Sequence, residues 1–284
     1  MKKLFAISAA ASLAFCLLAA SRPDATLVVT YDFERCRHEV DSLEYSTDQM
    51  ILQLAPTASR FFSAKTEFFD SLHSAPGGAK LIQQMQMDAL NSSGGIKRDA
   101  SGNITSITVD AKAMENVPSR GFLTCVYKDM DKGEMTIYDG IRGPSDVRYM
   151  YSLPVDEIAW EPGDSIATIL GYECQNATGE YHGRLWEAWF ASDLPLADGP
   201  WQLCGLPGLI LKATTAGDEY RLTATGVHSA AEPIKDLPGD PEIEKIDRRE
   251  FLKMLDKTHR DPGAMYGYPM PQEVFHDLIE TDYK

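Results

Sequence analysis

The chain has 284 residues, a formal net charge of −15 and an apolar content of 44%. This apolar fraction is typical of a globular protein rather than a disordered one. Nucleic acid and anionic lipid headgroups are not expected as partners, because a strongly acidic surface repels both. After residue 30 no apolar run is long enough to cross a bilayer, so a transmembrane protein is not expected.

The N-terminus has the pattern of a secretory signal. Two lysines precede an apolar stretch at residues 4–20, and small residues follow it, which predicts a signal peptide at residues 1–21. A lipoprotein signal would have a small residue before Cys16, but Phe15 stands there. We therefore expect a protein exported to the periplasm or associated with the outer membrane, without a lipid anchor. Loss of the two lysines would take the net charge from −15 to −17.

Residues 22–230 are predicted to form a β-rich domain. Residues 50–63 indicate a strand, a turn and a second strand, and residues 65–91 carry a helical pattern that is broken at residues 76–78. The polar segment at residues 91–103 is expected to be a loop. From residue 104 onward the apolar pattern has a period of two, and we expect three hairpins, with turns at residues 130–133, 176–179 and 216–218.

Residues 231–284 are predicted to be a linker, a helix and a C-terminal tail. A capping box at residues 247–250 precedes a helix over residues 248–258. Together these elements predict a mainly β fold of the α+β class. We expect a curved antiparallel β-meander or half-barrel with two or three packed helices.

Aromatic residues are the main candidates for a binding site. In the strand around Leu185 both faces become largely apolar, so either the sheet is covered on both faces or one face lines a hydrophobic cavity. In the second case an apolar or amphiphilic ligand would contact the aromatic side chains of Trp186, Trp189, Phe190 and Trp201. In the first case the same residues are simply core.

Four cysteines remain after the signal, namely Cys36, Cys125, Cys174 and Cys204, and they permit two disulfides in an exported protein. Buried free thiols are the alternative. A strand of ten residues spans about 33 Å, whereas the Cα atoms of a disulfide lie within about 7 Å. If the strands at residues 165–191 pair in sequence, Cys174 is therefore better placed to bond Cys36 or Cys125 than Cys204.

No catalytic residue, metal site or cofactor is predicted. The histidines are scattered, and His182 has no close partner in the sequence. The Asp-x-Asp pattern at residues 129–131 lacks the other ligands of a calcium loop. Residues 163–166 are similar to the nucleophile block of some serine esterases, but the further blocks of those enzymes are not evident.

The hexapeptide at residues 205–210 is part of a longer pattern. The positions of this pattern are Gly171, Tyr172, Cys174, Gly183, Arg184, Ala188, Trp189, Phe190, Pro195, Gly199, Pro200, Gly205, Leu206, Pro207, Gly208, Leu209 and Ile210. In this order they resemble the GLPGLI family of exported Bacteroidota proteins over residues 149–230. The resemblance implies an exported envelope protein and no particular reaction. Cys204 departs from the family, whose members more often carry an apolar residue there.

The hexapeptide itself predicts a rigid turn that begins a buried strand. Gly205 and Gly208 permit positive φ angles or close approaches that a Cβ would forbid. Pro207 donates no hydrogen bond, so the strand begins after it. A phosphate loop is not expected, because a helix would have to follow.

Three functions fit these observations. The first is a periplasmic binding or carrier protein for an apolar or amphiphilic ligand, which a pocket open to solvent beside Trp186 would favour. The second is an accessory protein that docks to an outer-membrane or transport partner, which a flat exposed patch at residues 195–208 would favour. The third and weaker one is a hydrolase, which a Ser or Asp within hydrogen-bond reach of His182 would favour.

Overall fold

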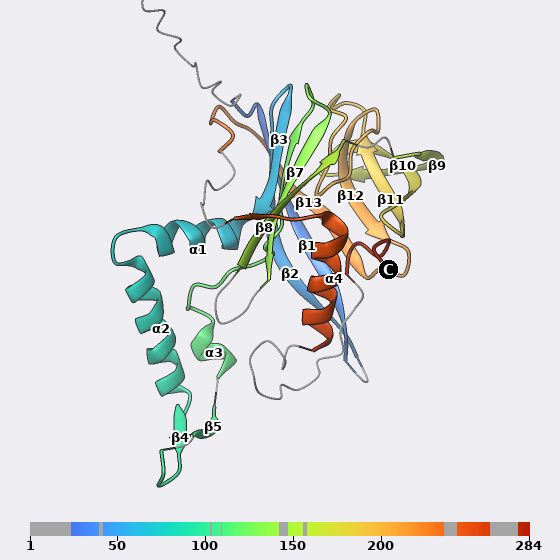
Figure 1. Cartoon of the computed structure of the whole chain (residues 1–284). Helices are drawn as coiled ribbons and strands as arrows, with labels where there is room; N and C mark the ends of the chain where they lie inside the picture. The colour runs from blue at the N-terminus through green and yellow to red at the C-terminus, as the bar shows by residue number, and fades with distance from the viewer. Residues whose placement is uncertain are drawn as a thin grey trace, which may run out of the picture.

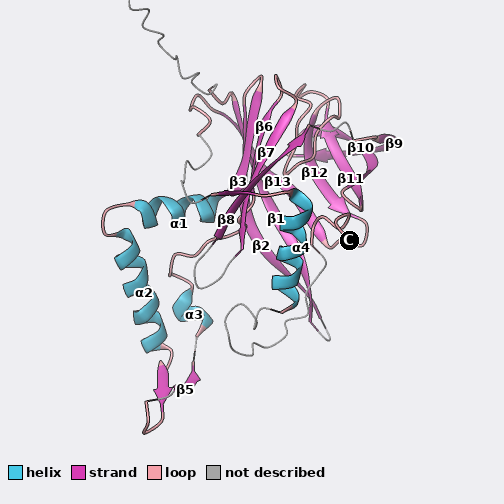
Figure 2. Cartoon of the chain, viewed as in Figure 1, coloured by secondary structure: helices cyan, strands magenta, loops and turns pink. Residues whose placement is uncertain are grey.

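A computed structural model describes residues 24–39, 42–102, 104–108, 110–141, 147–155, 158–235, 243–261 and 278–284. The expected signal peptide and most of the expected C-terminal tail lie outside the described residues. The described residues form one large sheet, a small two-stranded sheet and four helices (Figures 1 and 2). None of these helices is both long and apolar enough to cross a membrane.

The large sheet has twelve strands and stays open. In sheet order they are β14 (Glu244–Lys245), β8 (Val147–Pro154), β7 (Glu134–Ile141), β6 (Cys125–Asp129), β3 (Ala58–Ser63), β2 (Ser42–Leu54), β1 (Leu27–Glu39), β13 (Tyr220–Ser229), β12 (Leu209–Thr215), β11 (Arg184–Ala191), β10 (Tyr172–Tyr181) and β9 (Glu161–Ile169). Neighbouring strands are antiparallel except for the short β14–β8 pair. The prediction of a mainly β protein with a curved antiparallel sheet is confirmed.

The helices lie on both sides of this sheet. They are α1 (Ala64–Ser74), α2 (Gly78–Ser92), α3 (Ala111–Met114) and α4 (Arg248–Arg260), and the small sheet contains β4 (Ile96–Arg98) and β5 (Ile104–Ile107). The predicted helices over residues 65–91 and 248–258 are confirmed. Helix α1 begins at the end of β3, where the Ser63 hydroxyl accepts a hydrogen bond from the Thr66 N–H at 3.1 Å. Helix α2 packs on α1 and α3 and extends away from the sheet (Figure 1).

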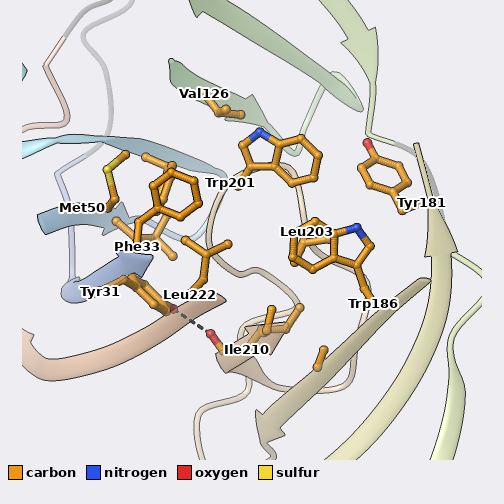
Figure 3. Packing of buried hydrophobic residues seen from close by; sticks show 14 of the residues in the cluster. Tyr31, Phe33, Met50, Val126, Tyr181, Trp186, Trp201, Leu203, Ile210 and Leu222 are labelled. Atoms are coloured by element: carbon orange, nitrogen blue, oxygen red, sulfur yellow. Dashed lines mark hydrogen bonds between the residues drawn. The ribbon is translucent and has the colours of Figure 1, made fainter. Parts of the chain in front are cut away.

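The inner face of the sheet, which we define by Val126 and Trp186, holds the main core. The sheet curls so that these side chains, on strands far apart in sheet order, lie on either side of Trp201 (Figure 3). Trp201 belongs to the crossing, residues 192–208, which connects β11 to β12 over this face. Helix α4 covers the same face further along, where the Phe251 ring lies 5.5 Å from that of Tyr149.

The outer face is the opposite side, and α1 covers its β3–β6–β7 end. Phe62, Cys125 and Tyr138 form a small buried cluster beneath this helix. At the other end of the sheet, the outer face of β9 to β12 is more open. There Leu185 is 48% exposed, while the next residue along β11 is buried in the inner core.

The hairpins around β10 differ from the sequence prediction. Two-residue turns at Leu170–Gly171 and His182–Gly183 have consecutive positive φ angles, of 53° and 85° and of 50° and 80°. This is the geometry of type I′ turns, whose twist matches that of the strands. The predicted turn at residues 176–179 is wrong, because these residues lie inside β10. Their turn-like residue types have another use, since the Asn176 side chain accepts a hydrogen bond from Ser165 N–H at 3.0 Å on β9.

The C-terminal residues 278–284 join the same core. Leu278 and Tyr283 are buried against it. The Arg184 guanidinium donates hydrogen bonds to the carbonyls of Ile279 at 2.9 Å and Leu278 at 2.7 Å. This segment therefore packs against the β10–β11 turn instead of forming a separate unit.

Candidate functional site

Three of the four aromatic side chains proposed for ligand binding lie in the inner core. Trp186 is 0%, Trp201 1% and Phe190 2% exposed. The rings of Trp186 and Trp201 are 5.6 Å apart and pack against each other. The fourth, Trp189, points to the outer face and is half-buried. A ligand could reach Trp189 but not the other three without opening the core.

A hollow opens on the outer face of β10 to β12, next to the backbone of Trp186. It has a volume of about 500 Å³ and is lined by Thr178, Leu185, Trp186, Glu187, Thr214, Thr215, Ala216, Gly217 and Asp218. Cross-strand pairing sets its floor, because Glu187 lies opposite Thr178 on one side and Thr214 on the other. A hydrogen bond from Arg221 lowers the pKa of Asp218 at the rim. The hollow thus combines an aliphatic side chain with hydroxyl and carboxylate groups.

The hexapeptide forms the tight turn at the end of the crossing. Gly205 has a φ of 92°, in the left-handed region. Gly208 serves a different purpose, because a Cβ on it would lie 2.3 Å from the carbonyl oxygen of Ala191. Leu209 and Ile210 are fully buried as β12 begins, and Ile210 O accepts a hydrogen bond from the Tyr31 hydroxyl at 2.7 Å (Figure 3).

A buried ion pair holds the crossing against the sheet. The Lys128 ammonium, on β6, donates to the Asp198 carboxylate at 2.5 Å and to the carbonyls of Gly199 and Leu203 at 3.0 Å each. These three acceptors satisfy its three N–H groups. The crossing is therefore tied down internally, and residues 195–208 are mostly buried instead of forming a flat exposed patch.

This ion pair was not predicted from the sequence, although the sequence contains a signal for it. Lys128 shares the inner face of β6 with Val126, so the period-two pattern places a cation at a core position. Its partner is 70 residues away in the sequence. Only the packing of the crossing over β6 identifies Asp198 as that partner.

A polar cluster surrounds His182, the first residue of the β10–β11 turn. Its Nδ1 lies 3.2 Å from an oxygen of Asp282, and its Nε2 lies 3.1 Å from the side-chain oxygen of Gln202. The Gln202 amide also donates to Glu280 at 3.0 Å. An Asp is thus within reach of His182, but the other ring nitrogen faces an amide oxygen. A general base would need that nitrogen directed at a nucleophilic hydroxyl.

The same cluster contains three metal-ligating groups. The ligand atoms of His182, Glu280 and Asp282 lie within 4.8 Å of one another. The Arg248 guanidinium bonds both carboxylates, Glu280 at 2.6 Å and Asp282 at 2.5 Å. Burial raises the pKa of Asp282, but the hydrogen bonds and charges of Arg248 and His182 together outweigh burial, so the net shift is downward. The Arg248 guanidinium occupies the place that a metal ion would take between these carboxylates. We therefore assign the cluster a structural role, which is to hold residues 278–284 against α4 and the β10–β11 turn.

The cysteines correct the disulfide prediction. Cys36, Cys125, Cys174 and Cys204 are all buried free thiols. The preferred pairing of Cys174 with Cys36 or Cys125 is therefore absent from the structure. Cys174 lies on β10, which β11, β12 and β13 separate from Cys36 on β1, and Cys125 on β6 lies three strands further along the sheet.

Comparisons with known proteins give one short family match. Residues 180–212 match a family described as "Protein of unknown function (Porph_ging)". This segment begins at the end of β10 and includes β11, the crossing and the first residues of β12. No curated protein matches the sequence.

Two solved structures share a distant resemblance. They are described as "Structure of PNGF-II in P21 space group" and "Structure of PNGF-II in C2 space group". The TM-scores are 0.48 and 0.47, each with 15% identity over 83% of this chain. The match covers 34% and 33% of those chains, so this protein spans about a third of their length. The family match thus remains limited to residues 180–212, over which the chain is similar to a family of unknown function.

Proposed function

We propose that this protein is an exported envelope protein that binds an amphiphilic ligand on the outer face of β10 to β12. The observation that carries this proposal is the open hollow of about 500 Å³ next to the backbone of Trp186. Export and a place in the envelope of a Bacteroidota bacterium are supported by the signal-like N-terminus and by the resemblance to the GLPGLI family.

The lining of the hollow defines the chemistry of the ligand. The exposed Leu185 side chain offers an apolar contact. Thr178 and Thr214 offer hydroxyl groups, and the Glu187 carboxylate lies between them. Carboxylates accept hydrogen bonds and attract cations, so the polar part of the ligand carries hydroxyl or ammonium groups rather than phosphate. The core residues Trp186, Phe190 and Trp201 support the floor from behind.

Native mass spectrometry of the mature protein, purified gently from bacterial periplasm, tests this proposal. We expect a non-covalent adduct that is lost on denaturation, and the mass difference would give the mass of the ligand. Uptake of the neutral dye Nile red is a second readout. Leu185→Ser should remove both signals, whereas Ile166→Ser should keep them, because Ile166 is equally exposed on β9 but does not line the hollow. A bare polypeptide that also fails to bind the dye would contradict the proposal.

A docking role is the second candidate, and the segment of residues 64–114 favours it. Phe68, Leu81 and Met87 in this segment are 62%, 51% and 44% exposed. Its five Lys or Arg balance its five Asp or Glu, while the whole chain carries −15. A partly apolar segment with no net charge, on a protein that is otherwise acidic, is suited to contact with another protein. Co-purification of an envelope protein that is lost in Leu81→Ser but kept in Leu185→Ser would favour docking over ligand binding.

A further inference from the structure

A small, partly open cavity lies beneath α1 on the outer face, far from the open hollow. Its volume is about 20 Å³. Its walls are formed by Arg60, Phe62, Ser63, Thr66, Glu67, Asp70, Phe122, Leu123, Thr124, Cys125, Tyr138 and Arg148. Such a volume holds one or two water molecules or a single monatomic ion, but not a phosphate or a sulfate.

Two buried arginines direct unused donors at this cavity. Arg60 is 3% and Arg148 9% exposed. Arg60 donates to Glu67 at 2.8 Å through Nη2, and Arg148 contacts Asp70 at 3.4 Å through Nη2. Within the part of the chain that the structure describes, the Nε and Nη1 atoms of Arg60 and the Nη1 atom of Arg148 have no hydrogen-bond partner. With one hydrogen on Nε and two on each Nη1, five N–H bonds are left without an acceptor.

The two guanidinium groups reach the cavity over different aromatic rings. The Arg60 group lies 4.1 Å from the centre of the Phe62 ring on β3. The Arg148 group lies 5.7 Å from the centre of the Tyr138 ring on β7. The Cys125 thiol lies between these rings in the sheet, because its strand β6 separates β3 from β7.

The two carboxylates in the cavity walls, Glu67 and Asp70, take up only the Nη2 atoms of Arg60 and Arg148. Burial raises the pKa of the Cys125 thiol even though Arg60 beside it lowers it, so the sulfur stays a neutral, weak acceptor. The Thr66 and Thr124 hydroxyls donate to Phe122 O at 2.9 Å and Asp139 at 2.5 Å, and neither accepts a hydrogen bond from the two arginines. A water molecule accepts about two hydrogen bonds, fewer than the number of free N–H groups.

The charged groups around the cavity nearly balance. Arg60 and Lys235 share the Glu67 carboxylate, and Arg120 and Arg148 share that of Asp70. Two further buried carboxyls lie close by. Asp48 accepts a hydrogen bond from the Phe122 N–H at 2.5 Å, and Asp139 bonds Thr124 and the Gly140 N–H, where burial raises its pKa to about 6. The free donors, and not a surplus of charge, therefore define what this cavity can bind.

We propose that the cavity binds a single halide-sized anion, chloride in the cell, through the free N–H groups of Arg60 and Arg148. The free donors and the cavity size both match a monatomic acceptor. The bound ion completes the hydrogen bonding of both arginines and fixes α1 to the β3–β6–β7 end of the sheet. This site is separate from the hollow on β10 to β12, so each can fail without the other.

Thermal unfolding in chloride and in gluconate tests the proposal. The mature protein is melted at a constant ionic strength of about 0.3 M while sodium chloride replaces sodium gluconate, so that general screening does not change. We expect Tm to rise with the logarithm of the chloride concentration above its dissociation constant, by roughly 3 °C where chloride exceeds that constant tenfold. A Tm that is the same in both salts would overturn the proposal.

Variants and a heavier halide localise the effect. Arg148→Gln should lose the chloride-dependent rise in Tm, whereas Arg221→Gln, an arginine on β13 with its own ion pairs, should keep it. If both variants keep the response, the site is elsewhere. Crystals soaked in bromide should show an anomalous peak between Arg60 and Arg148. Bromide peaks at the surface alone, with water in the cavity, would show that the cavity is only hydrated.

Discussion

The two faces of the sheet bury their cations in different ways. On the inner face, the Lys128 ammonium has three acceptors within 3.0 Å and leaves no donor unused. On the outer face, Arg60 is equally buried, yet two of its three nitrogens have no partner. A buried ion whose bonds are complete is part of the framework, because nothing further can bind to it. A buried ion whose bonds are incomplete identifies a place that a small ligand can complete.

Replacing Lys128 or Arg60 by methionine should give the largest difference in unfolding free energy between the two faces. Lys128→Met should cost about 3–5 kcal/mol of unfolding free energy, because Asp198 is left buried and unpaired. Arg60→Met should cost less, about 1–2 kcal/mol, because Glu67 keeps its contact with Lys235. Urea unfolding monitored by tryptophan fluorescence measures both. As a control, Lys132→Met at an exposed position should change little. Equal losses for the two buried cations would contradict the distinction.

The two faces of a single strand offer a second test. Trp186→Ala should cost about 3–5 kcal/mol, because the indole is fully buried against Trp201. Leu185→Ala, one residue earlier on the outer face, should cost about 0.5 kcal/mol or less. Denaturant midpoints of the two variants give the difference. Similar losses would mean that the outer face of β11 is covered in the protein in solution.

The inner face also contains a carboxyl whose charge is unfavourable. Burial raises the pKa of Asp139 from 3.8 to about 6. The folded state therefore binds this proton more tightly than the unfolded state does, and the wild type loses stability as pH rises from about 4 to about 6. The shift of about two pH units corresponds to roughly 2–3 kcal/mol above pH 6. Asp139→Asn should remove this loss, so its stability relative to wild type should be greater at pH 7.5 than at pH 4.5 in urea unfolding. Parallel pH profiles would show that Asp139 titrates normally.

The glycines of the hexapeptide give the smallest effect. Gly205→Ala should cost about 1 kcal/mol, because its φ of 92° is strained for alanine although no atom of the surroundings is close to the added Cβ. Gly208→Ala should cost more, because its Cβ would collide with the Ala191 carbonyl. Thermal melts of the two variants compare conformational strain with steric exclusion. A larger loss at Gly205 would contradict this assignment.

Local patterns predicted the parts of the fold that local chemistry controls. The hairpin turns at residues 130–133 and 216–218 were predictable, because turn residues there separate two alternating strands. The turn at Leu170–Gly171 was missed, because Asn176 and Gly179 suggested a stronger turn nearby. In the structure those two residues instead contact β9 and the Trp160 ring. Strand β1, which pairs with β2 and β13 at the centre of the sheet, was also not predicted.

The candidate sites depended still more on the three-dimensional arrangement. Composition and periodicity were enough to predict a β-rich acidic protein with aromatic residues near residue 186, because these properties are read within a few neighbouring residues. They could not assign Trp186, Phe190 and Trp201 to the core or leave the hollow beside Leu185 open. Those outcomes follow from the curl of the sheet around the crossing. The same curl pairs Lys128 with Asp198 and keeps the four cysteines apart, whereas α1 closes over the arginines on the other face. Such contacts join residues far apart in the sequence, and only the packing of the whole sheet brings them together.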